Sequence, residues 1–243
     1  MRNSFAHRRR APGAGFVKTA FWDGCSQFCQ SILSWQYHFR VEGSSNVPLT
    51  GAAIFIANHQ SLFDPVIHGL AVGDRAPRPM AKEELFKVPL FGSILRGLNC
   101  IRVRSDGGNR EAIRIALDEL AAGRTVMIYP EGTRSSDGAV HAFRRGVELL
   151  ARKSQAPIVP MGIDGAFDIW PTGRRLPRAR GRIWAAIGDP ISPVEHMALF
   201  ADPDAGLVQL QQRVTTLMRH CRTQLRRGSG GAFPAPGAAD GSS

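Results

Sequence analysis

The sequence predicts an α/β fold in which helices flank a mostly parallel central sheet. Short apolar segments of strand character alternate along the chain with segments of helical periodicity, which is the pattern of such sheets. The chain has 243 residues, of which 43% are hydrophobic, and this is enough to bury the core of one domain. We expect a single domain over residues 16–227, with strands at residues 39–42, 53–57, 78–82, 100–104, 125–129, 158–163 and 183–187.

The N-terminal region divides into a basic arm and a helix. Residues 1–15 are rich in arginine and interrupted by glycine and proline, so we expect them to be disordered. In residues 16–39, apolar side chains recur at steps of three and four, which predicts an amphipathic helix. Its many aromatic side chains and basic neighbours suit a helix that lies in a membrane interface. Packing of the same helix against the sheet of the domain is an equally good interpretation.

Two further regions complete the expected domain. A helical pattern over residues 109–123 begins with Asn109 as N-cap and stops at Gly123. A last amphipathic helix is expected over residues 205–227. The remaining residues, 228–243, are rich in glycine, alanine, serine and proline, which predicts a disordered tail.

The charge of the chain narrows its possible partners. A formal net charge of +11 and an isoelectric point near 10.7 favour polyanions, namely nucleic acid, phosphorylated substrates or anionic membranes. The sequence has no apolar run of about 18 residues and no signal-peptide pattern. The four cysteines are not spaced as a metal or redox pair and are interpreted as buried side chains in a reducing compartment. We therefore expect the protein on the cytoplasmic side of a membrane.

The segment IFIANHQSLFDPVI, residues 54–67, joins an expected strand to an expected helix. His59 follows the strand, and Asp64 comes five positions later, directly before Pro65. Taken alone, Asp64 and Pro65 are a good helix start, and His59 is an ordinary polar residue at a strand end. Ligands of parallel sheets bind at the carboxyl ends of strands. The pair therefore gains functional weight if other segments converge on the same edge of the sheet.

A second segment, YPEGTRSSDG, follows the expected strand at residues 125–129. It places Glu131, Gly132 and Arg134 within four residues. One interpretation is a turn followed by a solvated arginine. The other is a phosphate cradle, since glycine lets backbone N–H groups approach and a guanidinium binds phosphate through two parallel hydrogen bonds. Arg144 and Arg145 add cations nearby.

These two segments together resemble the first and third sequence blocks of the glycerolipid acyltransferases, best typified by the bacterial 1-acyl-sn-glycerol-3-phosphate acyltransferases. The matching patterns are NHxxxxD at residues 58–64 and YPEGTR at residues 129–134. Each block alone is a weak pattern, but both in this order are specific. The resemblance covers roughly residues 40–190, with further matches at residues 81–92, 98–105, 143–146 and 158–163.

The resemblance implies a role for each residue of these blocks. Acyl transfer from a thioester to an alcohol needs a base for the hydroxyl proton, and neutral imidazole has a suitable pKa. His59 would be that base, and Asp64 would fix its tautomer and stabilise the imidazolium. The acceptor's own hydroxyl attacks, so no protein nucleophile is needed. The resemblance also implies substrate contacts, and Arg134 is the first candidate for the phosphate. The substrate-binding residues would be Asn58, Lys82, Arg104, Glu131, Gly132, Thr133 and Arg134.

The second block of the family departs from its usual pattern in this chain. Asn99 stands where a glycine is usual, and the expected arginine is either Arg104 or, in an ungapped alignment, replaced by Ser105. Side chains alternate along a strand, so Arg102 and Arg104 would share one face. We expect Arg104, nearer the carboxyl end, to contact the acceptor phosphate.

The sequence thus predicts an O-acyltransferase that transfers a fatty acyl group from acyl-CoA or acyl carrier protein to lysophosphatidic acid and forms phosphatidic acid. No metal or redox cofactor is implied. The expected partners are these two substrates and an anionic membrane surface, and nucleic acid is not expected. Glycerol 3-phosphate, another lysophospholipid or an acylated lipid-linked sugar are alternative acceptors. A non-catalytic, basic protein that binds membranes or nucleic acid is the alternative from a different class.

Overall fold

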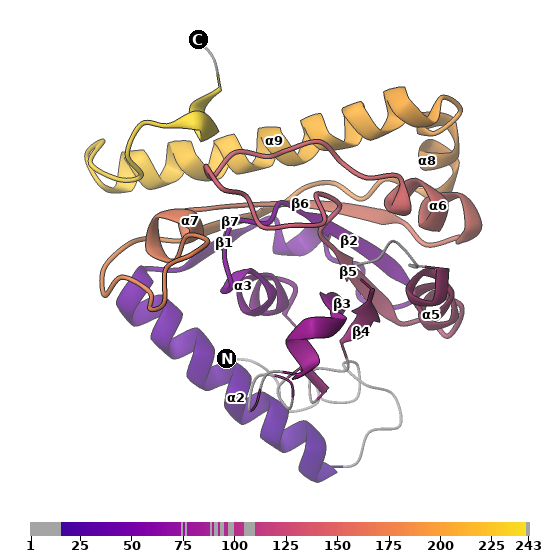
Figure 1. The fold of residues 1–243 in the computed structure, drawn as a ribbon, viewed down its shortest axis with the longest axis horizontal. Helices are drawn as coiled ribbons and strands as arrows, with labels where there is room; N and C mark the ends of the chain where they lie inside the picture. Colours follow the sequence, from indigo (N-terminus) through magenta and orange to yellow (C-terminus); the bar gives the residue numbers. More distant parts are fainter. Residues whose placement is uncertain are drawn as a thin grey trace.

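The computed structural model describes residues 16–73, 75, 77–87, 89, 92, 95–96, 100–104 and 110–241. Seven strands form one sheet in the order β1-β7-β6-β2-β5-β3-β4 (Figure 1). Each expected strand is confirmed to within one residue at either end. The strands are β1 Arg40–Glu42, β2 Ala53–Ala57, β3 Arg78–Lys82, β4 Ile101–Val103, β5 Thr125–Ile128, β6 Ile158–Asp164 and β7 Trp184–Ile187.

The sheet is mostly parallel, as predicted. Strand β2 pairs in parallel with both β5 and β6, and β3 pairs in parallel with both β4 and β5. Strand β7 runs antiparallel to β6 and parallel to β1, so the last two strands at this end of the sheet have the opposite direction. The carboxyl ends of the five co-directional strands therefore meet at one edge of the sheet, with β2 and β5 side by side.

Helices cover both faces of the sheet (Figure 1). One face is covered by α2, α3 and α7, and the other by α5, α6, α8 and α9. Short 3-10 turns are present at Ser44–Asn46, Glu83–Lys87 and Ala238–Asp240. The helices are α2 Phe16–Tyr37, α3 Asp64–Ala71, α5 Arg110–Ala121, α6 Gly146–Lys153, α7 Ala166–Ile169, α8 Pro193–Leu199 and α9 Pro203–Gly228.

Strand β2 lies at the centre of this arrangement, and all five of its residues are fully buried. Its side chains alternate: Phe55 packs with the α2, α3 and α7 layer, whereas Ile54 and Ile56 pack with the opposite layer. Because both faces are covered, the strand reads as a continuous apolar run. The run ends where the polar segment Asn58 to Ser61 begins.

Helix α9 packs closely on β6 and β7. Asp202 caps it by accepting hydrogen bonds from the N–H groups of Asp204 and Ala205. A Cβ atom added to Gly162 of β6 would lie 2.4 Å from the backbone nitrogen of Met218. Glycine at this position therefore allows the helix to approach the sheet more closely than any other residue would.

Helix α2 shows features of both interpretations of its amphipathic pattern. Leu33 and Tyr37 are buried in the core. Phe28 and Trp35 face outward and are 67% and 84% exposed. Within the described residues, no helix is both long enough and apolar enough to cross a bilayer. One side of α2 thus packs on the domain and leaves another side of large apolar groups uncovered.

The C-terminal segment differs from the expected disordered tail. Residues 229–241 fold back along α9, and Ala239 is buried. Asp240 forms ion pairs at 2.7 Å with both Arg222 and Arg226 of α9. Composition predicted disorder because it cannot show that the one acidic residue of this segment meets two arginines. The expected basic arm, residues 1–15, lies outside the described residues.

Candidate active site

His59 and Asp64 are in direct contact at the carboxyl end of β2. The Nδ1 atom of His59 lies 2.6 Å from Oδ2 of Asp64. Asp64 is the first residue of α3 and Pro65 the second, so a helix begins at the expected place, but the Asp64 carboxylate bonds to the preceding loop and does not cap the helix. The loop from the end of β2 to the start of α3 is short, and it brings the side chains of His59 and Asp64 together.

The carboxylate of Asp64 is held mainly through one oxygen. Oδ2 also accepts hydrogen bonds from the backbone N–H groups of Gln60 at 2.5 Å and Ser61 at 2.8 Å. Asp64 is fully buried, whereas the side chain of His59 is 19% exposed. With Nδ1 bonded to the carboxylate, Nε2 has no hydrogen-bond partner within the described part of the chain. This nitrogen is available to take a proton from a bound molecule.

Two residues that the sequence interpretation missed support the imidazole. The ring of Tyr129 stacks on His59 with centroids 4.2 Å apart and planes 21° apart. The Tyr129 hydroxyl in turn lies 3.1 Å from Nδ1 of His68. His68 follows Asp64 by one helical turn, and Tyr129 follows β5, which is adjacent to β2. Their positions, one helical turn after Asp64 and directly after a strand, are the features from which the two residues could have been identified as neighbours of His59.

The two side chains that support the His59 ring, Tyr129 and His68, are uncharged at neutral pH. Burial lowers the pKa of His68 from 6.5 to about 4. Burial also raises the pKa of Tyr129 well above its usual value. A neutral, packed layer therefore fixes the ring of His59 from one side and adds no competing charge.

Glu131 connects the two segments singled out in the sequence. Its Oε1 accepts a hydrogen bond from the His59 backbone N–H at 2.8 Å, and its Oε2 accepts one from the His141 N–H at 3.1 Å. Burial raises the pKa of this carboxyl group. Both oxygens are occupied by the protein, so the expected substrate contact is corrected to a positioning contact that holds His59.

Asn58 requires a similar correction. Its side chain is fully buried, and its amide group forms two hydrogen bonds with the backbone of Ile163 in β6, at 3.0 and 2.9 Å. Asn58 therefore fixes the end of β2 against β6 and does not face a substrate. The partner lies 105 residues away in sequence, which is why the local pattern could not identify it.

Gly132 and Arg144 are packed against each other. Gly132 has a positive φ of 74°, which favours glycine. Its N–H donates to the Tyr129 carbonyl at 3.0 Å. A Cβ atom added here would lie 2.7 Å from Nε of Arg144, and the Arg144 N–H donates to the Pro130 carbonyl at 2.9 Å. The guanidinium of Arg144 thus lies over the turn that follows β5.

Arg134 is near His59 in the chain fold, because the next residue, Ser135, is bonded to the His59 backbone. The Ser135 N–H donates to the His59 carbonyl at 2.6 Å. Thr133 is exposed and Arg134 half-buried. Within the described residues, neither Arg134 nor Arg144 forms an ion pair with a carboxylate, whereas Arg145 pairs with Asp204 at 2.7 Å. Two guanidinium groups without a carboxylate partner in the described part of the chain therefore belong to the segment that follows β5, which is bonded to His59 through the Ser135 N–H.

The other expected phosphate ligands lie farther along the sheet. Lys82 ends β3, and its side chain lies outside the described part of the chain, as does Ser105. Arg104 is exposed and follows β4, which is three strand positions from β2, or about 14 Å at the usual strand spacing. The guanidinium of Arg102 lies 4.9 Å over the Phe86 ring. A phosphate contact by Arg104 stays a prediction.

A buried polar network joins the site to the C-terminal segment. Nε2 of Gln60 donates to the Gly138 carbonyl at 2.7 Å and to Oδ1 of Asp164 at 3.2 Å. Asp164 accepts a hydrogen bond from Arg222 at 3.0 Å, and Arg222 also pairs with Asp240. Burial raises the pKa of Asp164 to about 6, although Arg222 opposes this shift. No local sequence pattern indicates this network, which links β6, α9 and Gln60, the residue after His59.

The fold and the histidine–carboxylate pair can be compared with known proteins. Residues 38–164, just over half of the chain, match the profile of the acyltransferase family. The chain therefore belongs to this family, as its sequence blocks predicted. A crystal structure of the 1-acyl-sn-glycerophosphate acyltransferase PlsC from Thermotoga maritima is similar, with a TM-score of 0.65 and 27% identity, and the match covers 96% of this chain and 88% of that one.

Two curated relatives carry a similar enzyme name. A chloroplastic 1-acyl-sn-glycerol-3-phosphate acyltransferase from Arabidopsis thaliana is 28% identical over 64% of this chain and 44% of its own length. The enzyme of the same name from Bacillus subtilis is 27% identical over 73% of this chain and 83% of its own length. The chain thus spans less than half the length of the chloroplast relative and most of the bacterial one.

Proposed function

We propose that this chain transfers a fatty acyl group from acyl-CoA or acyl carrier protein to the free hydroxyl of 1-acyl-sn-glycerol 3-phosphate. The product would be phosphatidic acid. The observation that carries the proposal is the contact between His59 and the buried Asp64, with Nε2 of the histidine left without a partner among the residues that the structure describes. The names of the similar proteins from Arabidopsis thaliana, Bacillus subtilis and Thermotoga maritima support this choice of acceptor.

In the proposed reaction, His59 acts as general base. The acceptor hydroxyl oxygen forms a bond to the thioester carbonyl carbon while its proton passes to Nε2 of His59. The tetrahedral intermediate then collapses, the carbon–sulfur bond breaks, and the departing thiolate takes the proton back from the imidazolium. Asp64 keeps the other ring nitrogen protonated and stabilises the imidazolium between these steps.

The phosphate of the acceptor would be held by Arg134 and Arg144. Both guanidinium groups lie on the loop that is bonded to His59 and Pro130 through its backbone. Guanidinium groups bind phosphate oxygens in a fixed two-pronged geometry. Such positioning can supply up to roughly 7 to 11 kcal/mol of a rate enhancement. The N–H groups of Thr133 and Arg134, without an acceptor among the described residues, are candidates to stabilise the oxyanion.

We further propose that the reaction takes place at the cytoplasmic face of a membrane. The acceptor and the product are lipids, and α2 leaves Phe28 and Trp35 exposed. A helix of this kind binds the interface between headgroups and acyl chains.

Thiol release from acyl-CoA tests the proposal. Purified full-length chain is incubated with the donor and with no acceptor, lysophosphatidic acid, glycerol 3-phosphate, lysophosphatidylcholine or an acylated lipid-linked sugar. We expect thiol release that depends on lysophosphatidic acid, together with an equal amount of phosphatidic acid measured by mass spectrometry. Release with a different acceptor alone would keep the chemistry and replace the substrate. No release with any acceptor, from either CoA or acyl carrier protein donors, would contradict the enzyme assignment.

A further inference from the structure

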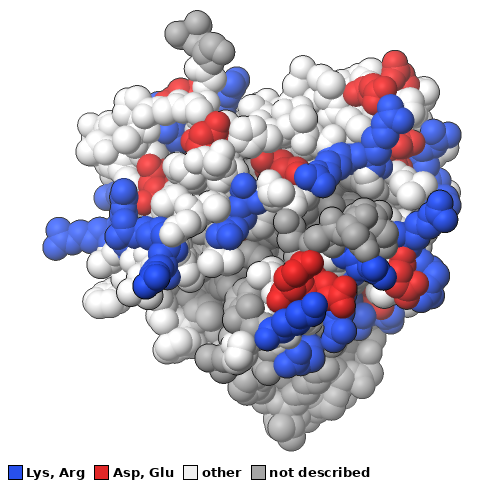
Figure 2. Space-filling view, in the orientation of Figure 1, with Lys and Arg blue, Asp and Glu red and all other residues white. Residues whose placement is uncertain are grey.

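The loop between α7 and β7, residues 171–182, carries a dense positive charge. Its five arginines fall within nine residues. Among the described residues, none of the five forms a direct ion pair with a carboxylate. Figure 2 shows Lys and Arg side chains projecting from the edge of the molecule where α7 and this loop lie in Figure 1. The arginines are Arg174, Arg175, Arg178, Arg180 and Arg182.

The loop is fixed against the C-terminal end of α2. The Tyr37 hydroxyl donates to the Arg178 carbonyl at 2.9 Å, and Nε2 of Gln36 donates to the Ala179 carbonyl at 3.2 Å. The Arg178 N–H donates to the Ile169 carbonyl at 2.9 Å. The backbone of the loop is thus bonded on both sides, which holds the arginines in one region and lowers the entropy cost of binding.

Large apolar side chains are exposed beside these cations. Leu176 lies between Arg175 and Arg178 and is 74% exposed. Trp35 directly precedes Gln36, the residue bonded to the loop, and Phe28 is exposed farther along α2. Isolated arginines are usually solvated, but arginines next to exposed leucine and tryptophan are typical of surfaces that bind a bilayer interface.

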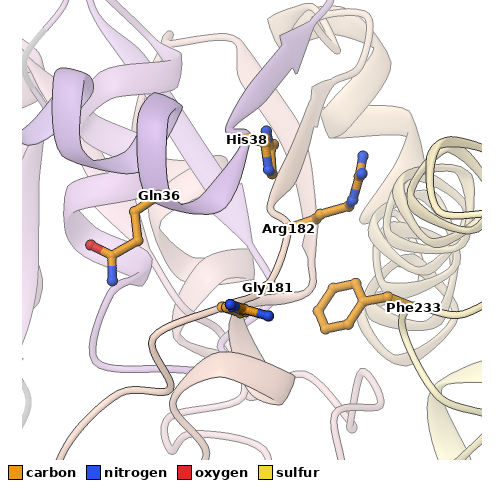
Figure 3. Close-up of a pocket in the computed structure, with 6 residues that line it drawn as sticks. Gln36, His38, Gly181, Arg182 and Phe233 are labelled. Atoms are coloured by element: carbon orange, nitrogen blue, oxygen red, sulfur yellow. The ribbon is translucent and has the colours of Figure 1, made fainter.

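An open pocket lies at the end of the loop. Its volume is about 420 Å³, and Arg180 and Arg182 contribute to its lining. Figure 3 shows Gln36 and His38 at the end of α2, Gly181 and Arg182 on the loop, and Phe233 on the C-terminal segment around it. Guanidinium groups donate hydrogen bonds and accept none, so the pocket suits an anionic, oxygen-rich group such as a phosphate diester.

The beginning of the loop is joined to the candidate active site. The Ser61 hydroxyl donates to the Trp170 carbonyl at 3.0 Å, and the Phe63 and Trp170 rings lie 4.9 Å apart. The Thr172 hydroxyl donates to the Ser135 carbonyl at 3.3 Å. The arginine-rich loop is therefore bonded to both loops that carry the site, and a surface bound to it would lie near the exposed side of the histidine.

We propose that residues 171–182 and the C-terminal half of α2 form a docking surface for a bilayer that contains anionic phospholipid. The arginines bind lipid phosphates, one headgroup occupies the pocket at Arg180 and Arg182, and Leu176 and Trp35 enter the interface. Positive charge complements the anionic headgroups, and the apolar groups favour a bilayer over a free anion. The use of this surface to deliver a lipid acceptor rests on the proposed function, whereas the binding itself does not.

Vesicle sedimentation without acyl donor tests this surface. The full-length chain is mixed with vesicles of phosphatidylcholine alone or phosphatidylcholine with phosphatidylglycerol. The loop variant combines Arg174→Gln, Arg175→Gln and Arg178→Gln. A control variant removes the same charge from exposed residues of the opposite layer by Arg110→Gln, Lys153→Gln and Arg213→Gln. We expect binding to anionic vesicles to weaken roughly fivefold per loop arginine, on the order of 100-fold in total, and far less for the control.

A single substitution covers the case in which the loop variant does not fold. Leu176→Glu changes one exposed side chain and should weaken binding to anionic vesicles roughly 10-fold or more, through lost apolar burial and added repulsion. Thermal melting of every variant accompanies the binding curves.

Several outcomes would overturn the proposal. Unchanged binding by Leu176→Glu or by a folded loop variant would do so, and so would equal losses in the loop and control variants. Binding of inorganic phosphate to the loop, with no preference of the chain for anionic vesicles over phosphatidylcholine vesicles, would indicate a site for the free anion. Loss of duplex DNA binding in the loop variant, with vesicle binding retained, would indicate a nucleic-acid surface. Because no donor is present, an inactive enzyme would leave the binding result intact.

Discussion

Asp64 and Asp164 are both fully buried carboxylates near the ends of the paired strands β2 and β6, but their surroundings differ. Asp64 faces an imidazole that is partly exposed and two backbone N–H groups. Asp164 faces Arg222, which is itself buried and covered by the C-terminal segment. The first pair opens toward solvent, whereas the second is closed on all sides that the structure describes.

Gln60 contacts both carboxylates, through its N–H to Asp64 and its side chain to Asp164. The two pairs are therefore parts of one connected structure, for which we propose two different uses. A buried carboxylate supports proton transfer when its partner keeps a free nitrogen, and it supports the fold when its partner is fully bonded. Substitutions should separate these uses, with losses of turnover at one carboxylate and losses of stability at the other.

Of the substitutions that separate the two carboxylates, Asp64→Asn should have the largest effect. We expect kcat for acyl transfer to fall on the order of 10³-fold, because the imidazole loses its fixed tautomer and the stabilisation of its charged form. The free energy of unfolding should change much less than kcat. Asp164→Asn is the matched control, and its folded fraction should retain most of kcat. Equal losses of kcat in the two variants would remove the distinction between the carboxylates.

Arg222→Met should lower the free energy of unfolding by about 3 kcal/mol, measured by urea denaturation, because it leaves the buried Asp164 without its counter-ion. Arg226→Met is the control. Arg226 also pairs with Asp240, but at the surface, so its loss should cost less than about 1 kcal/mol. Similar losses of unfolding free energy in both variants would show that the network at Asp164 contributes no more to stability than a surface ion pair.

Arg134→Ala and Arg144→Ala should each raise KM for lysophosphatidic acid roughly 10-fold to 150-fold, the equivalent of about 1.5 to 3 kcal/mol for a lost charge-assisted hydrogen bond. Arg145→Ala controls for charge, because Arg145 is the adjacent arginine but pairs with Asp204. Steady-state kinetics with varied acceptor measure the effect. A KM increase in Arg145→Ala as large as in Arg144→Ala would assign the effect to general charge.

His68 should make stability depend on pH. Burial lowers its pKa from 6.5 to about 4, so the unfolded chain binds a proton below pH 6.5 that the folded chain excludes. This contribution is complete above pH 6.5 and is lost as the pH falls toward 4. Between pH 7.5 and 5 the loss is about 2 kcal/mol. Urea denaturation of His68→Gln should lack this part of the pH dependence, and an unchanged profile would contradict the buried neutral state.

The sequence located the strands because each is an apolar run bounded by polar or turn residues, and burial on both faces of the sheet keeps such runs continuous. It also singled out His59, Asp64 and Arg134, which occupy local patterns at strand ends; the structure brings His59 and Asp64 into contact, and the roles of all three residues stay predictions. It misplaced Asn58 and Glu131 as substrate ligands, because their partners on β6 and in the 138–145 loop depend on tertiary packing. The ordered C-terminal segment was missed for the same reason, since Asp240 acquires its partners only when the chain folds back on α9.

Acyl transfer by His59→Ala, measured beside the unchanged protein, tests the central claim most directly. The measurement is phosphatidic acid formed from acyl-CoA and lysophosphatidic acid per folded molecule, with folding checked by circular dichroism. If His59 is the base at the open end of its pair with Asp64, the rate should fall on the order of 10⁴-fold while the melting temperature changes little. A folded His59→Ala protein that forms phosphatidic acid at the normal rate would contradict the account.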